Sequence, residues 1–151
     1  MRLLIDASNL IPESGGFVHL KKILENFSTR KFDKIIVLSS SKVLKKLNIK
    51  NAKILYQTNF FLNNNLFFRI LWKTFILNFT AKNSKSDIIF ILGGYFFFKP
   101  KIPTVILIQN LLPFSNISII NENISTFIKN KILRILHIQS IKRADLSIYL
   151  S

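Results

Sequence analysis

Short apolar runs alternate along this chain with longer segments in which apolar residues recur every three or four positions. The runs are four to nine residues long and are bounded by polar or turn-forming residues, a pattern typical of strands that are buried on both faces. Six strands are therefore predicted, at Leu3–Asp6, Ile35–Ser40, Ala52–Thr58, Ser86–Gly94, Thr104–Asn110 and Ala144–Ser151.

Four segments between these runs have helical spacing. Leu20 and Leu24 share one face of the first, and Phe75 and Phe79 join the apolar side of the third at core-like periodicity. Ser41 stands where it can cap the second. The predicted helices are Val18–Phe27, Ser41–Leu47, Asn65–Lys82 and Ile124–Lys142.

Strands that alternate with helices and are apolar on both sides form a parallel sheet with helices on both faces. The sequence therefore predicts an α/β fold, a Rossmann-like doubly wound parallel sheet, in a single domain over residues 1–151. Ligands of such sheets bind beyond the carboxyl ends of the strands. The segments that we expect at this edge are Asp6–His19, Thr58–Asn65, Gly93–Phe97 and Gln109–Phe114.

The net charge of the chain indicates a class of binding partner. Lys and Arg number 22 against seven Asp and Glu, a net charge of +15, and residues 34–86 contain ten bases and no acid. Such a surface attracts polyanions, either nucleic acid or an anionic membrane. The 15 Phe and 15 Asn, with abundant Ile and Lys, also fit an AT-rich genome, which raises the Lys content without selection for binding.

Composition also excludes several classes of site. The chain has no Cys and two His, so disulfides and thiolate sites are excluded and a zinc site is not supported. The apolar run after Arg2 is too short for a signal peptide, and Leu66–Ala81 contains Arg69 and Lys73, which a membrane span would avoid. We expect a cytoplasmic chain, either free or peripheral at the cytoplasmic membrane.

Gly15-Gly16 is the first candidate for chemistry. A glycine pair between the first strand and the first helix either forms a flexible turn or lets backbone N–H groups approach a phosphate. The pair matches neither the Walker A motif nor the dinucleotide fingerprint. His19, one turn further on, is either a packed or solvent-exposed residue, or a polar contact or proton handler near a substrate cleft.

Two later strand ends carry further candidates. Gln109 and Asn110 are amides that either bind a hydroxyl-rich ligand or shape the following turn. Gly93 and Gly94 precede an aromatic stretch that either contacts a ligand or another domain, or anchors its own loop.

Other titratable residues do not form a catalytic set in the sequence. Asp6 ends a strand, Asp87 and Asp145 begin strands, and no two carboxylates are placed for acid and base roles. His137 lies within a long basic helix and is interpreted as structural. The chain therefore looks catalytically incomplete.

Five stretches together carry a resemblance to a known family. In order, they are RLLIDASNLIPESGGFVHL, FDKIIVLSS, SDIIFILGG, VILIQNLLPF and KRADLSIYLS. Their order and spacing resemble the N-terminal, acceptor-side domain of the family-4 retaining glycosyltransferases with the GT-B fold. The resemblance covers essentially the whole chain and is strongest at QNLLPF and ADLSIYLS.

This resemblance implies a sugar transfer from a nucleotide-sugar donor to a glycan or lipid-linked acceptor in cell-surface polysaccharide synthesis. It places Gly15 and Gly16 beside the donor diphosphate, and it makes His19, Gly93, Gly94, Gln109 and Asn110 candidates for the acceptor-side cleft. Gln109 and Asn110 stand where the family often has His or His-Asp, so no proton transfer is assigned there. The family needs no metal and no cofactor, because the nucleotide sugar is the substrate.

The resemblance also implies a second, donor-binding domain that these 151 residues do not contain, in cis or in trans. We therefore expect this chain to be a fragment or one part of a split enzyme, inactive alone. The basic helices would lie near anionic lipid, with Arg69, Lys73, Lys129 and Arg134 as membrane-facing candidates.

Two other classes of function remain open as alternatives. One is a non-catalytic basic α/β module that binds nucleic acid or an anionic membrane surface; the lack of a recognition motif disfavours nucleic acid. The other is a response-regulator-like or nucleotide-binding domain, which would need an acidic cluster or a Walker lysine that the sequence lacks.

Overall fold

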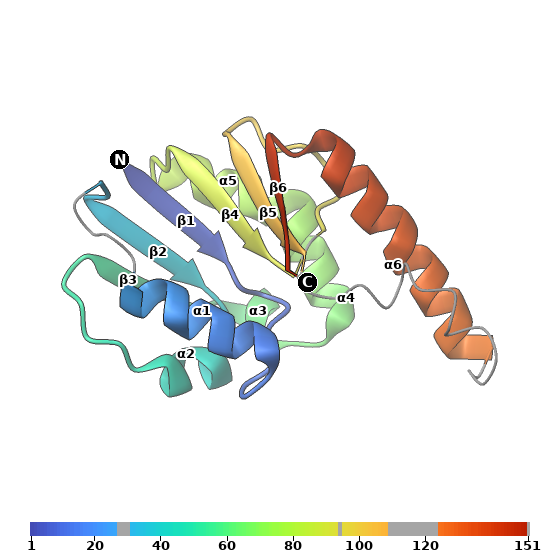
Figure 1. Cartoon of the computed structure of the whole chain (residues 1–151), viewed down its shortest axis with the longest axis horizontal. Helices are drawn as coiled ribbons and strands as arrows, with labels where there is room; N and C mark the ends of the chain where they lie inside the picture. Colours follow the sequence, from blue (N-terminus) through green and yellow to red (C-terminus); the bar gives the residue numbers. More distant parts are fainter. Residues whose placement is uncertain (27–30, 94, 109–123, 151) are drawn as a thin grey trace.

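The computed structural model describes residues 1–26, 31–93, 95–108 and 124–150, and for residues 66 and 124–129 it describes the backbone alone. Its centre is a sheet of six parallel strands in the order β3-β2-β1-β4-β5-β6 (Figure 1). The predicted α/β, Rossmann-like doubly wound fold is thereby confirmed. The strands are β1 (Arg2–Asp6), β2 (Lys34–Leu38), β3 (Ile54–Gln57), β4 (Ile88–Leu92), β5 (Thr104–Ile108) and β6 (Leu146–Tyr149).

All four predicted helical segments are present, and the described part of the structure adds one short helix. The predicted helix over 65–82 is a continuous helical segment whose middle, η1, is a π turn. A short helix at 60–63 was expected to be loop; Asn59 caps it, its side chain accepting a hydrogen bond from the Leu62 amide at 3.1 Å. The segments are α1 (Gly15–Asn26), α2 (Ser41–Leu47), α3 (Phe60–Asn63), α4 (Leu66–Leu71), η1 (Trp72–Ile76), α5 (Leu77–Asn83) and α6 (Ile124–Arg143).

One predicted helix cap and one predicted helix start are wrong. Ser41 is the first residue of α2 and not its cap; Ser40 occupies the cap position without a side-chain bond, and the Ser41 amide donates to Asn63 Oδ1 at 2.7 Å. Helix α1 begins at Gly15, three residues before the predicted start, so Gly15 and Gly16 belong to its first turn.

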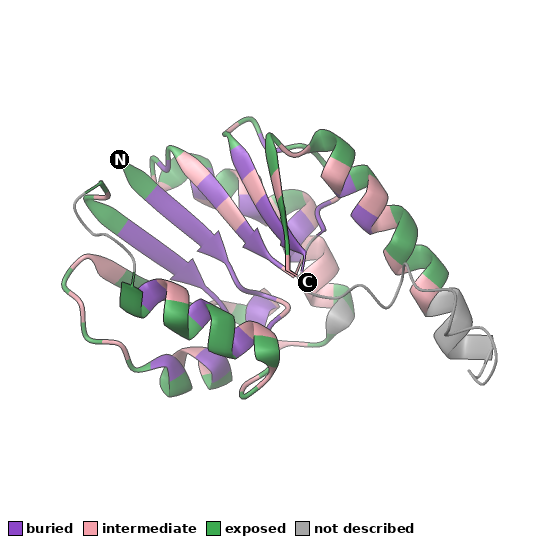
Figure 2. Ribbon diagram, viewed as in Figure 1, coloured by how far each residue is buried: buried purple, intermediate pink, exposed green. Residues whose placement is uncertain are grey.

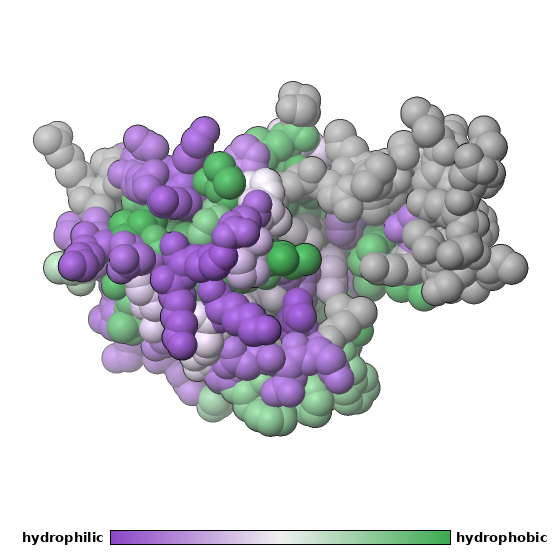
Figure 3. Space-filling view, turned by 90° about the horizontal axis from the view of Figure 1, so that it is seen from below, coloured by the Kyte–Doolittle hydropathy of each residue, from purple (hydrophilic) through white to green (hydrophobic). Residues whose placement is uncertain are grey.

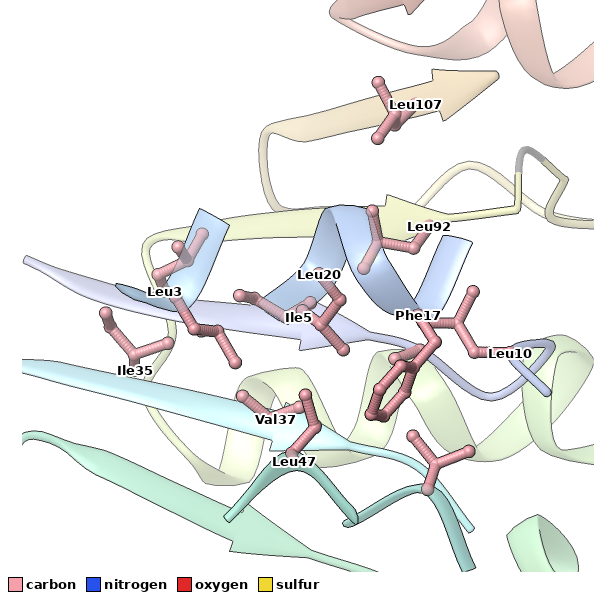
Figure 4. Close-up of a cluster of buried hydrophobic side chains, with 13 residues drawn as sticks. Leu3, Ile5, Leu10, Phe17, Leu20, Ile35, Val37, Leu47, Leu92 and Leu107 are labelled. Atoms are coloured by element: carbon pink, nitrogen blue, oxygen red, sulfur yellow. The ribbon is translucent and has the colours of Figure 1, made fainter. Parts of the chain in front are cut away.

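Successive residues of the inner strands point to opposite faces of the sheet, and both faces are buried. Leu3 and Ile5 of β1 enter the apolar cluster beneath α1 and α2, which Figure 4 shows in close-up. Leu4, between them, enters the cluster that contains Trp72 and Leu77 of the α4–α5 segment. Figure 2 shows the result, with β1 and β2 buried along most of their length. Burial on both sides explains why these strands are continuously apolar.

The orientation of the α4–α5 segment differs from the prediction. Phe75 and Phe79, expected at the core, are 66% and 63% exposed, whereas Trp72, Leu77 and Ala81 are buried. This segment has apolar residues all round, so periodicity alone did not determine which side faces the sheet.

Candidate functional site

The strand order reverses its direction of growth between β1 and β4. From β1 the chain adds strands on one side as far as β3, and from β4 it adds strands on the other side as far as β6. The loops after β1 and β4 therefore begin on either side of the point where the strand order reverses. Doubly wound sheets form their ligand-binding crevice at such a point. The candidate site consists of these two loops, residues 7–14 and 93–103, and the start of α1.

The loop after β1 is held to the sheet and delivers α1 to its edge. The Ala7 amide donates to the Leu38 carbonyl at 2.8 Å, and Ser39 Oγ donates to the Ala7 carbonyl at 2.8 Å. Ser14 Oγ accepts from the Phe17 amide at 3.3 Å, which satisfies one free N–H of the first turn. Glu13, with φ 66°, forms an ion pair with Lys46 of α2.

Gly93 joins the two loops at their closest approach. Its φ is +91°, in the region that only glycine adopts without strain, and a Cβ there would lie 3.3 Å from Asn9 Cβ. Glycine at this position is therefore explained by the fold. Gly93 was predicted to lie at this edge of the sheet. Its backbone conformation allows the loop after β4 to contact the loop after β1.

A buried ion pair underlies these loops. Lys73 Nζ of η1 lies 2.7 Å from Asp6 Oδ2 at the end of β1, and both side chains are 0% exposed. The other carboxylate oxygen of Asp6 accepts from the Ser8 amide at 3.2 Å. Lys73 Nζ also donates to the Tyr95 carbonyl at 3.3 Å and lies 5.0 Å from the centre of its ring. One lysine thus connects the loop after β1, the loop after β4 and the helical segment behind the sheet.

The loop after β4 is fixed in turn to α6. The Tyr95 ring stacks on His137, with ring centres 6.0 Å apart. Ser140 Oγ accepts from the Phe96 amide at 2.9 Å, and Arg143 donates to the Phe97 carbonyl at 2.7 Å. The aromatic stretch after β4 therefore anchors its own loop, which was one of the two interpretations of the sequence.

The buried network also acts on His137. Burial lowers the pKa of His137 below its ordinary value, and the positive charge of Lys73 lowers it further. The imidazole is therefore neutral at pH 7, in agreement with the structural role expected for it. Asp6 and Lys73 are enclosed and bonded to each other, so neither presents a nucleophile or a base to a substrate.

The structure places some of the predicted residues at this edge and not others. Gly15 and Gly16 form the first turn of α1, and Gly93 lies where the loops meet. His19 lies on the exposed surface of α1. Gly94, Gln109 and Asn110 lie outside the described residues, so their predicted roles stay predictions.

The predicted membrane-facing residues also differ in where the structure places their side chains. The prediction that Lys73 faces a membrane was wrong. Its ammonium group points into the protein, because Asp6 and the Tyr95 carbonyl bind it there. Arg69 is half-buried and donates to the Asn64 carbonyl at 3.2 Å. Arg134 is exposed, and the side chain of Lys129 lies outside the described residues.

The Asp6–Lys73 pair was missed, although the sequence contains a signal for it. Lys73, Leu77 and Ala81 follow one another at intervals of four, and so share one side of a helix. A lysine in line with two core residues needs a buried anion, and Asp6 ends a strand that is otherwise apolar from Leu3 onward.

Within the described part of the chain, no group of three or more His, Asp or Glu side chains could hold a metal ion. No described helix is both long enough and apolar enough to cross a membrane. Comparison of the chain with protein-family models, with curated proteins and with solved structures found no match in any of the three.

Proposed function

We propose that this chain is the acceptor-side domain of a retaining glycosyltransferase of the GT-B type. The observation that carries the proposal is a glycine that the fold does not require. Gly15 has no left-handed φ, and a Cβ added to it would meet nothing within 4 Å. Glycine is among the poorest helix formers, and at this position it leaves the backbone of the first turn of α1 open to the close approach of a ligand, which supports the proposal.

The position of this turn supports an anionic ligand. It follows β1 at the point where the strand order reverses, and its first N–H groups carry the positive end of the helix dipole. The diphosphate of a nucleotide sugar has the charge that such a turn binds. The strand-end motifs that resemble the GT-B family point to the same ligand.

The proposed reaction needs a second domain. The bond between the sugar C1 and the diphosphate oxygen breaks, an acceptor hydroxyl oxygen forms the new bond to C1 with the same configuration, and the hydroxyl proton passes to the departing diphosphate. The turn at Gly15 and Gly16 would stabilise the departing diphosphate, while a donor-binding domain in cis or in trans holds the nucleotide. The acceptor is a glycan or a lipid-linked glycan, and the place of action is the cytoplasm.

A backbone-resolved titration with uridine diphosphate tests the diphosphate site. We expect the amide NMR signals of Gly15 and Gly16 to move most, because the Phe17 amide of the same turn already donates to Ser14 Oγ. Gly15→Asp should abolish these shifts through repulsion and bulk, yet leave the melting temperature unchanged or raised, since an acidic residue is favourable at a helix start.

Ser41→Asp is the matched control, because it adds the same charge to the first turn of α2. It should leave the titration unchanged. Equal shifts in the wild type and in Gly15→Asp, or no shift at these amides in the wild type, would overturn the diphosphate site.

A further inference from the structure

The outer side of the α4–α5 segment is made of phenylalanine. Phe67, Phe75 and Phe79 are 62%, 66% and 63% exposed, while Trp72 and Leu77 on the inner side are buried. This segment is covered on one side only by the described residues, so its outer side is an unmatched apolar surface.

The π turn keeps these rings together. An unbroken α-helix of 3.6 residues per turn would place Phe75 roughly 80° around the axis from Phe67, and the wider turn of η1 reduces that offset. At the other end, Phe60 of α3, 62% exposed, contacts Phe68 with ring centres 5.1 Å apart. We call Phe60, Phe67, Phe75 and Phe79 the phenylalanine ridge. Figure 3 shows hydrophobic side chains along the lower margin of that view, on the side where α3 and α4 lie.

The sequence segment that contains the ridge carries charges of one sign only. Residues 34–86, which contain it, include no acid, and Lys82 and Lys85 are exposed directly after Phe79. The inward lysine of this segment, Lys73, is neutralised by Asp6. Helix α6, whose end packs against the same face of the sheet through Ile141, also contains no acid. By contrast, α1 on the opposite face pairs Lys21 with Glu25.

We propose that the phenylalanine ridge is a docking surface for an anionic lipid bilayer. The rings enter the boundary between headgroups and acyl chains, and Lys82 and Lys85 contact the headgroups. A second copy of the chain would bring another charge of +15 to the same surface, which repels it, whereas an anionic bilayer complements it. The inference does not rest on the proposed sugar transfer, since it uses no residue of the diphosphate site.

Flotation with two kinds of vesicle tests the docking. The chain should float with vesicles of 70% phosphatidylcholine and 30% phosphatidylglycerol and remain below with pure phosphatidylcholine. The double variant Phe75→Ser/Phe79→Ser should reduce the partition coefficient by a factor on the order of ten or more, because two apolar rings no longer enter the bilayer. Val18→Ser/Ile11→Ser, which changes two exposed apolar residues outside the ridge, is the control and should bind like the wild type.

A second pair of variants separates local contact from overall charge. Lys82→Gln/Lys85→Gln should weaken binding to the anionic vesicles about 30-fold, at roughly fivefold for each base. Lys22→Gln/Lys42→Gln removes the same charge from α1 and α2 and should weaken it much less. Equal weakening by the two pairs would overturn docking through the ridge and leave only a long-range attraction.

Fluorescence reports insertion directly. Trp72 is 1% exposed and is the only tryptophan, so Trp72→Phe/Phe75→Trp moves the fluorophore to the ridge. Its emission should shift to shorter wavelength on anionic vesicles. An unshifted emission, or equal flotation with both kinds of vesicle, would overturn the proposal. So would single-stranded RNA binding that depends on Phe75 and Phe79 while vesicle binding stays at background.

Discussion

Helices α1 and α4–α5 cover opposite faces of the same sheet with opposite arrangements of charge. Helix α1 turns Phe17, Leu20 and Leu24 inward and places Lys21 beside Glu25 on its exposed side. The α4–α5 segment turns Lys73 inward and exposes Phe75 and Phe79. Both bury apolar residues against the sheet, but only α1 also keeps its charged residues on the exposed side.

The difference shows what decides the orientation of a helix. In α1 the apolar residues occupy one side, so burial of that side leaves a single solution. In α4–α5 either side could be buried, and a charge at the end of β1 needs a partner. An unpaired buried carboxylate costs more free energy than a few exposed rings, so Asp6 selects the side that carries Lys73.

Removal of the buried positive charge of Lys73 should have the largest effect on the stability of the fold. Lys73→Met leaves Asp6 buried without its cation, and we expect a loss of about 3–5 kcal/mol in the free energy of unfolding, measured with urea. The double variant Asp6→Asn/Lys73→Met should recover part of this loss, because no charge is then buried alone.

The exposed pair on α1 is the matched control for that experiment. Lys21→Met breaks an i,i+4 pair whose side chains are about half exposed, and it should cost less than about 0.5 kcal/mol. A Lys73→Met loss as small as this would show that Asp6 does not orient the segment.

Truncation of apolar side chains on the two helices should give the next contrast. Leu20→Ala removes a fully buried side chain from beneath α1 and should cost about 2–5 kcal/mol. Phe75→Ser removes a larger side chain from the ridge. It should change the free energy of unfolding by no more than about 0.5 kcal/mol, since most of the ring is already in water. Urea titrations of both variants measure this, and a large loss in Phe75→Ser would mean that the ridge is covered within the chain itself.

The smallest expected effect is a pH dependence that begins at His137. Because its pKa is lowered in the folded chain, the unfolded chain binds the proton first as the pH falls through about 6.5. The contribution of neutral His137 to the free energy of unfolding is therefore complete above that pH and decreases below it. Thermal melts at pH 7.5 and pH 5.5 should differ less in His137→Gln than in the wild type.

His19→Gln is the matched control for the substitution, because it replaces a histidine on the exposed surface of α1. Acidic groups whose pKa values are lowered titrate below this window. They are Glu13, Asp33 and Asp145. A pH dependence unchanged in His137→Gln would assign it to other groups.

The fold could be predicted from the sequence because its signals are local. Continuous apolar runs at Leu3–Asp6 and Ile35–Ser40 report burial on both faces, and only a covered parallel sheet provides it. The predicted strands extend past the observed ends, because Ser39 and Ser40 follow apolar residues and yet leave the sheet. Helix α3 was missed, because four residues between asparagines have no helical period to detect.

The site was predicted only in part, because its main contacts are long-range. Gly15 and Gly93 could be found as glycines at strand ends, which is a local pattern. The partnership of Asp6 and Lys73 spans 67 positions, and the docking of the Tyr95 loop on His137 depends on where α6 packs. Such contacts follow from the tertiary arrangement and not from spacing along the chain.

The ion pair beneath the loops also imposes an order on folding during synthesis. β1 lies in the middle of the sheet, yet its last residue carries a charge whose partner is made 67 residues later. The first three strands can associate earlier, but the end of β1 stays hydrated until the α4–α5 segment has left the ribosome and docked. The end of the central strand and the helical layer behind the sheet therefore depend on each other, since the carboxylate of Asp6 is paired only once Lys73 is in place.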